Sequence, residues 1–181
     1  MKNEINRIAN KLVKAFNTNT VINPIPVKYC KNINLANKLR KLCEDQIKDE
    51  TIGIKAGGTG IQALKKLKEK EPFTAKVFKK RLVKSGQKVK INQHTKGIEV
   101  EVYYFIKKSF FDFKGKVTKS NVTKFIKFMG PCFEIVGFRQ RNKKFTYLGD
   151  ICGDFGFNIK FVVGRKTKFK KLNLNNLKTS L

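Results

Sequence analysis

Acidic residues are scarce in this chain, histidine occurs once, and tryptophan is absent. Of the 181 residues, 13 are Asp or Glu and 41 are Lys or Arg, which gives a formal net charge of +28. Such a charge attracts anions, whether nucleic acid, anionic lipid or acidic small molecules. The lysines are scattered along the whole sequence, as compositional drift on solvent-facing positions would also leave them. The charge by itself therefore does not identify a partner.

The four cysteines also form no recognisable site. No C-x-x-C pair is present, and the single histidine cannot complete a Cys/His zinc centre. No signal peptide is recognisable, so the cysteines are expected to be buried thiols. No apolar run reaches the length of a membrane span, and we expect a cytoplasmic protein without a membrane anchor.

Hydrophobic periodicity predicts helices first and mixed strands afterwards. Helical patterns occupy residues 5–16, 34–47 with Asn34 as the cap, 61–67, and 120–129 ended by Gly130-Pro131. Strand patterns occupy residues 51–57, 74–78, 87–91, 98–104, 132–138 and 155–164. This order predicts an α+β fold. We divide the chain into an N-terminal helical segment (1–50), a core (51–165) and a basic, loose tail (166–181).

Two of the few acids stand two residues apart in the stretch GIEVEVYYFIKK. Side chains at i and i+2 of a strand point to one face, so Glu99 and Glu101 lie on the same face with Cα atoms about 6–7 Å apart. Like charges that close repel unless water or a cation separates them. A solvated strand face and a cation site are both compatible with the pattern.

Glu134 is the third acid of interest, because it stands alone in the apolar stretch CFEIVGF. A buried carboxylate is costly unless it is paired or metal-bound. Three carboxylates without histidine or thiolate suit a hard cation such as Mg²⁺ or Mn²⁺. One of the many lysines is the alternative partner for Glu134.

Lys55 lies just before the glycine-rich turn AGGTG, which lets a ligand approach the backbone closely. Neither a phosphate-binding loop nor a G-x-G-x-x-G fingerprint matches this order. Lys55 could act as an acid/base or hold an anionic substrate. A surface lysine with a partly covered stem is the alternative.

Five motifs stand together in one order: GIKAGGT, EPFTAKVF, IEVEV, PCFEIVGFR and LGDICGDFGFNIKFVVG. In this order and spacing, residues 20–165 resemble the 2-keto-4-pentenoate hydratase branch of the fumarylacetoacetate hydrolase superfamily. The resemblance implies a mixed β-roll with N-terminal helices, apparently truncated at its C-terminal side. It also implies Mg²⁺ or Mn²⁺ and a metal-stabilised enolate during hydration of a 2-hydroxy-dienoate or 2-oxo-enoic acid.

The resemblance assigns roles position by position. The metal ligands are Glu99, Glu101 and Glu134; the catalytic residues are Lys55 and Asp154; the substrate-binding residues are Gly57, Thr59, Arg139 and Asp150. The chain departs from the family pattern near the substrate, with Ala75, Phe138 and Phe155 where the family has Gly, Ser and Asn. A different substrate or lost activity would follow from these changes.

Several alternatives stay open at this stage. Related enzymes of the superfamily decarboxylate a 2-oxo acid or hydrolyse a C–C bond, and a catalytically impaired homologue would keep the motifs. The chain could also be a basic nucleic-acid-binding protein that uses Tyr103, Tyr104 and Phe105, although the neighbouring glutamates oppose phosphate and predict weak, non-specific binding. Because the resembled family continues beyond Gly164 for several strands, we expect a homo-oligomer or a separate C-terminal partner chain.

Overall fold

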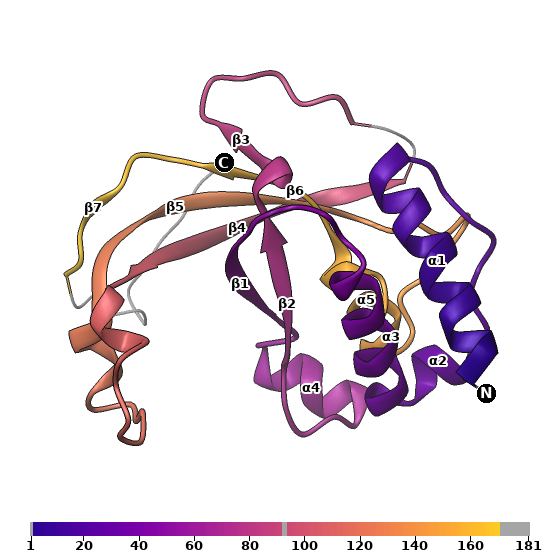
Figure 1. Cartoon of the computed structure of the whole chain (residues 1–181), viewed down its shortest axis with the longest axis horizontal. Coiled ribbons are helices and arrows are strands. Elements are labelled where there is room, and N and C mark those ends of the chain that lie inside the picture. The colour runs from indigo at the N-terminus through magenta and orange to yellow at the C-terminus, as the bar shows by residue number, and fades with distance from the viewer. Residues whose placement is uncertain (1, 92–93, 171–181) are drawn as a thin grey trace.

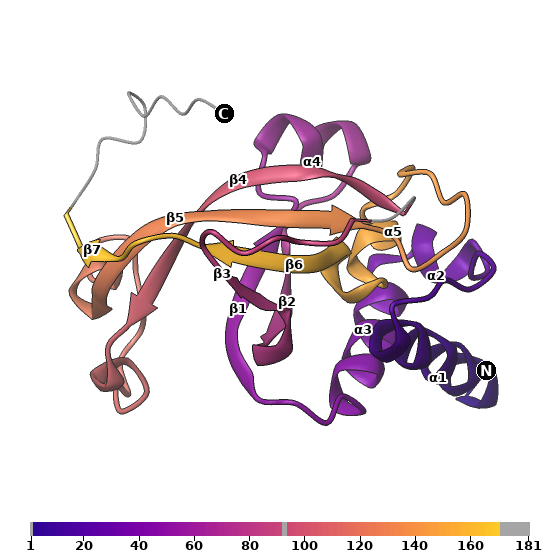
Figure 2. The same ribbon diagram turned by 90° about the horizontal axis from the view of Figure 1, so that it is seen from above.

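The computed structural model describes residues 2–91 and 94–170. A long, curved sheet spans the molecule, with most helices gathered at one end and a two-stranded sheet under its middle (Figures 1 and 2). The predicted α+β class with N-terminal helices is confirmed. Among the described residues, no helix is long and apolar enough to cross a membrane.

The helical end is built from α1 (Lys2–Thr18), α2 (Lys28–Lys31), α3 (Ile33–Asp45) and α5 (Leu148–Cys152). Apolar residues of α1 recur at helical spacing and are buried, among them Ile5, Ile8, Leu12 and Phe16. The four cysteines are free thiols and are buried, as the sequence predicts.

The cap of α3 differs from the prediction. Asn32, not Asn34, precedes the helix in an extended conformation, and its side-chain oxygen accepts from the backbone N–H groups of Asn34 and Leu35 at 3.0 and 3.1 Å. Those are the free N–H groups that an N-cap satisfies. Asn34 is instead a residue of the first turn.

The smaller sheet pairs β1 (Thr51–Gly57) with β2 (Phe73–Phe78) in antiparallel fashion, and α4 (Ile61–Leu67) lies between them in sequence. The larger sheet has the order β3 (Leu82–Lys84), β6 (Asn158–Val163), β5 (Ile126–Gly137) and β4 (Thr95–Ile106). β3 runs parallel to β6, and the other neighbours are antiparallel. A two-residue strand, β7 (Thr167–Lys168), also pairs with β5, in a segment predicted to be loose.

The predicted helix over 120–129 is wrong. Only a 3₁₀ turn forms, at Val122–Phe125, and β5 then runs from Ile126 through Gly130 and Pro131. Residue-by-residue pairing of β5 with the whole of β4 replaces the helical pattern, since tertiary context overrides local periodicity. Gly130 lies against the Tyr103 ring, so the close approach of a side chain explains a glycine in this strand.

Two further strand predictions need correction. Residues 87–91 form no strand; the segment leaves a turn in which the Gln87 side chain accepts from the Lys84 N–H. In 155–164, the strand covers Asn158–Val163, and residues 155–157 form a separate 3₁₀ turn.

Candidate metal and substrate site

The register of two strands brings the three predicted metal ligands together. Glu99 of β4 lies directly opposite Glu134 of β5, and Glu101 follows two residues later on the same face. One carboxylate oxygen from each residue lies within 4.8 Å of the other two. Glu134 is buried, whereas Glu99 and Glu101 are exposed. Three acidic side chains thus converge from a rigid pair of strands.

The surroundings disfavour so much negative charge. Glu101 is exposed as a residue, but partial burial of its carboxyl raises the pKa, the neighbouring Glu99 carboxylate raises it further, and the Lys55 ammonium opposes the rise. Burial also raises the pKa of Glu134, while the Lys55 ammonium and a hydrogen bond from Asn158 oppose the rise. A cation among these groups would remove the repulsion.

Lys55 already contributes one such charge. Its Nζ donates to both carboxylate oxygens of Glu134 at 2.5 and 2.7 Å and to the carbonyl oxygen of Gly156 at 2.9 Å. With a side chain only 10% exposed, Lys55 is not a surface lysine. The two roles considered for Glu134 are therefore both compatible with the structure: it has a lysine partner, and it belongs to a carboxylate cluster.

The segment that supplies the Gly156 carbonyl has an unusual backbone. Phe155, Gly156 and Phe157 all have positive φ, at 52°, 67° and 70°. Such a conformation costs about 1–3 kcal/mol at each non-glycine residue and persists only where surrounding contacts enforce it. A Cβ at Gly156 would lie 2.7 Å from that of Ala75, so this position also needs glycine for space. The strained turn fixes the carbonyl that orients Lys55.

Asp154, predicted to be catalytic, lies in a buried network instead of among the carboxylates. Its side chain is fully buried and accepts from the backbone N–H of Arg139 at 2.8 Å, from Arg139 Nη1 at 3.2 Å and from Gln140 Nε2 at 3.2 Å. Arg139 also donates to the Asn158 carbonyl and stacks near the Phe155 ring. Burial lowers the pKa of Arg139, and the Asp154 carboxylate opposes that effect. The pair positions β6 and the strained turn.

Asp150 likewise interacts with residues close to it in sequence. It accepts from the backbone N–H groups of Thr146 and Tyr147 at the start of α5 and pairs with Lys143 at 2.7 Å. Burial would raise its pKa, but the hydrogen bonds from Lys143 and these N–H groups hold the pKa of Asp150 below its usual value. Asp150 therefore caps a helix.

The remaining predicted substrate residues lie at the end of β1 and in the turn that follows it. Gly57 ends the strand opposite Phe73, whose ring fills the space where a Cβ would lie. Thr59 is exposed between β1 and α4. Their substrate role stays a prediction.

Sequence reasoning missed two contributors to the cluster, Asn158 and the Gly156 carbonyl. Asn158 is a buried polar residue at the start of β6, and its side chain helps to hold down the pKa of the Glu134 carboxyl. Its position at the start of a mostly apolar strand was an available signal. A backbone carbonyl leaves no such signal in the sequence.

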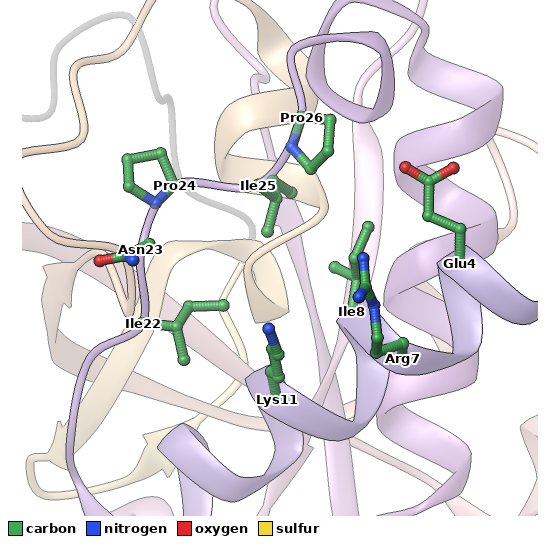
Figure 3. Close-up of a pocket in the computed structure, with 9 residues that line it drawn as sticks. All are labelled: Glu4, Arg7, Ile8, Lys11, Ile22, Asn23, Pro24, Ile25 and Pro26. Atoms are coloured by element: carbon green, nitrogen blue, oxygen red, sulfur yellow. The ribbon is translucent and has the colours of Figure 1, made fainter.

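A cavity of about 440 Å³ lies elsewhere, between α1 and residues 22–26 (Figure 3). Ile8, Ile22 and Ile25 form apolar walls, and Arg7 and Lys11 point toward it from the helix. None of the predicted site residues lines this cavity, so we do not take it as the candidate active site.

Comparisons with known proteins identify the fold. No protein-family model and no curated protein matches the chain. Two solved structures of the 4-oxalocrotonate decarboxylase from Pseudomonas putida G7 resemble it. The complex with magnesium and adipate has a TM-score of 0.70 at 15% identity, and the complex with calcium and acetate has 0.74 at 16%.

Each superposition covers 93% of this chain but only 65% and 64% of the decarboxylase chains. The chain thus spans just under two thirds of the length of these structures. The likeness confirms the predicted fold of the fumarylacetoacetate hydrolase type. At this identity it shows the fold alone, and the hydratase branch stays a prediction.

Proposed function

We propose that the chain belongs to a divalent-metal-dependent enzyme that acts on a small anionic 2-oxo or 2-hydroxy-dienoic acid, with hydration as the reaction. The observation that carries the proposal is the convergence of Glu99, Glu101 and Glu134, with the Lys55 ammonium bound to Glu134. Oxygen donors of this kind fit a hard cation, Mg²⁺ or Mn²⁺. The magnesium and calcium in the two decarboxylase complexes support the same metal class.

A bound divalent cation would polarise the oxygens of the 2-oxo acid as a Lewis acid. The three carboxylates would hold it. We assign Lys55 to the substrate, because its ammonium lies next to the carboxylates and can hold a substrate carboxylate or move a proton. The net charge of +28 would draw such anions toward the protein.

Decarboxylation of a 2-oxo acid is the second candidate reaction, since the two structures named above are of a decarboxylase. The two reactions are separable with two substrates. Loss of the ultraviolet absorbance of a conjugated 2-hydroxy-dienoate, dependent on Mg²⁺ or Mn²⁺, is expected for a hydratase. Release of CO₂ from a 2-oxo-dienedioate without dienoate hydration would establish the decarboxylase instead. A chain that binds metal and performs neither reaction would be an impaired homologue, as the departures from the family pattern at Phe138 and Phe155 would allow.

Metal binding has a test that needs no substrate. A ligand at 100 times its Kd stabilises the folded state by about 2.7 kcal/mol, which for a chain of this size raises Tm by roughly 5–10 °C. We expect Mn²⁺ to produce such a shift in the wild-type protein and not in Glu101→Gln. Glu71→Gln, an exposed acid outside the cluster, is the control with the same charge change. Equal shifts in all three proteins would refute the site.

We also propose that the chain works as a homo-oligomer or with a partner chain. The sheet face opposite the glutamates exposes Ile98, Val100 and Phe133, which are 55%, 39% and 41% accessible. Adjacent apolar side chains of this kind mark interaction surfaces. Size-exclusion chromatography with light scattering should show an assembly larger than one chain. A monodisperse monomer that binds no apolar dye would contradict this expectation.

A further inference from the structure

At the end of the sheet remote from the helices lie two segments that take no part in the proposed metal site. They are residues 105–128, which leave β4 and return into β5, together with residues 165–170, which include β7. We call these two segments the distal arm. In Figure 1 they lie at the opposite end of the molecule from α1, α2 and α5.

The distal arm concentrates positive charge. Residues 105–128 contain seven lysines and one acid, Asp112, and residues 165–170 contain Arg165, Lys166, Lys168 and Lys170 with no acid. Within residues 2–91 and 94–170, every ion pair lies outside the arm. The helical end, by contrast, has acids that pair with its lysines, such as Glu4 with Lys28. Although lysines are spread along the whole sequence, the positive charge that is not balanced by nearby acids is concentrated in the distal arm.

Aromatic rings lie between these cations. Phe105 is 53% exposed and Phe111 is 72% exposed. The ammonium of Lys166 lies 5.9 Å from the ring centre of Phe105 and 5.1 Å from that of Phe128, and Lys127 also lies over Phe128 at 5.4 Å. Phe105 and Phe128 are cross-strand neighbours on one face of the sheet. Rings and positive charges thus share one surface.

We propose that the distal arm binds single-stranded nucleic acid without sequence preference. Surfaces that do so combine cations along the phosphate backbone with aromatic rings on which bases stack. A duplex fits less well, because its bases are already stacked within the helix and offer no free face to Phe105 or Phe111. An anionic membrane also fits less well. Inserting the Phe105 and Phe128 rings would carry the Lys127 and Lys166 ammoniums toward hydrocarbon, which is costly.

The glutamates of β4 do not oppose this binding. Glu101 precedes Phe105 by four residues, or about 13 Å along a strand. That separation exceeds the screening length of about 8 Å at physiological ionic strength. The carboxylates are moreover gathered around Glu134 and Lys55. The two sites are therefore electrostatically separate, and the nucleic-acid proposal stands or falls independently of the enzyme.

The test compares a fluorescein-labelled 20-nucleotide oligo-dT with a 20-base-pair duplex by anisotropy at about 0.15 M salt. The triple variant Lys116→Gln, Lys119→Gln, Lys127→Gln removes three exposed arm charges. We expect it to weaken oligo-dT binding by at least tenfold and to reduce the salt slope by about 2, at about 0.7 per phosphate contact. The matched triple Lys11→Gln, Lys38→Gln, Lys41→Gln removes the same charge from α1 and α3 and should change both by less than about twofold. If both triple variants lose the same amount of oligo-dT affinity, the net charge of the whole protein accounts for binding and the proposal is overturned.

Stacking has its own readout. Phe105→Ala and, separately, the more exposed Phe111→Ala should each weaken oligo-dT binding by about tenfold while leaving duplex binding unchanged. If neither substitution distinguishes the two nucleic acids, the rings do not stack with bases and the proposal fails. A third measurement uses vesicles that contain phosphatidylserine in place of nucleic acid. Arm-dependent binding that is tighter for these vesicles than for oligo-dT would assign the surface to membranes instead.

Discussion

Replacing Lys55 with methionine is expected to lower the turnover of a conjugated 2-hydroxy-dienoate by about 10²-fold or more. Proton transfer by a positioned side chain typically contributes 10²–10⁴-fold to a rate. Lys55 directly contacts the carboxylate cluster, through both oxygens of Glu134. Ultraviolet absorbance at saturating Mn²⁺ measures the effect. Lys65→Met, on the exposed side of α4, is the matched control and should keep the wild-type rate.

The same variant separates a substrate role from a structural one. Removing Lys55 leaves Glu134 buried without its ammonium partner, and breaking a buried pair costs about 3–5 kcal/mol. Without metal, Lys55→Met should therefore melt at a lower temperature than wild type. A divalent cation would take over the charge compensation, so the Mn²⁺-induced rise in Tm should be larger in the variant than in wild type. A Mn²⁺-stabilised variant that keeps full turnover would reduce Lys55 to a structural counter-charge.

The metal cluster was predictable because strand geometry is regular. A period of two places Glu99 and Glu101 on one face without any knowledge of the fold. That Glu134 would lie opposite Glu99 depends on the register of β4 with β5, which no local pattern encodes. The order of motifs supplied this information through the resemblance. The Lys55–Glu134 contact joins residues 79 positions apart, and local patterns do not encode it for the same reason.

The predictions that failed rested on local sequence patterns alone. The apolar residues of 120–129 suit a helix, but the long partner strand β4 offers backbone hydrogen bonds along its whole length, and β5 takes them up. Asn34 has a side chain that suits a cap, but it is Asn32 whose backbone has the extended conformation that a cap requires. In 155–157, a strand pattern covers three residues with positive φ. Tertiary contacts override the local preference in β5 and around Gly156, whereas the cap of α3 is decided by the backbone conformation of Asn32.

The resemblance also transferred acidic positions whose surroundings differ. Five of the six acids after Pro72 match family positions, yet only three form the cluster. Asp150 satisfies backbone N–H groups at a helix start, and Asp154 is enclosed by Arg139 and Gln140. A catalytic role for Asp154 therefore needs a test that distinguishes chemistry from positioning.

Asp154→Ala is expected to destabilise the protein by about 3–5 kcal/mol, because it leaves the buried Arg139 guanidinium without its carboxylate. For a chain of this size, Tm should fall by roughly 2–4 °C per kcal/mol, as measured by differential scanning calorimetry. Asp154→Asn keeps an acceptor for the Arg139 backbone N–H and should lose less stability. The double variant Asp154→Ala, Arg139→Met removes both charges and should recover part of the loss, since apolar replacements of buried pairs are often tolerated.

The accompanying measurements decide the role of this carboxylate. If Asp154 positions the turn that orients Lys55, Asp154→Asn should keep the Mn²⁺-induced rise in Tm and lose turnover in proportion to its loss of stability. If it reacts with the substrate, Asp154→Asn should melt close to wild type and still lose turnover by about 10²-fold or more. The buried contacts favour the first result, because an oxygen already engaged by Arg139 and Gln140 has no free path to a substrate proton.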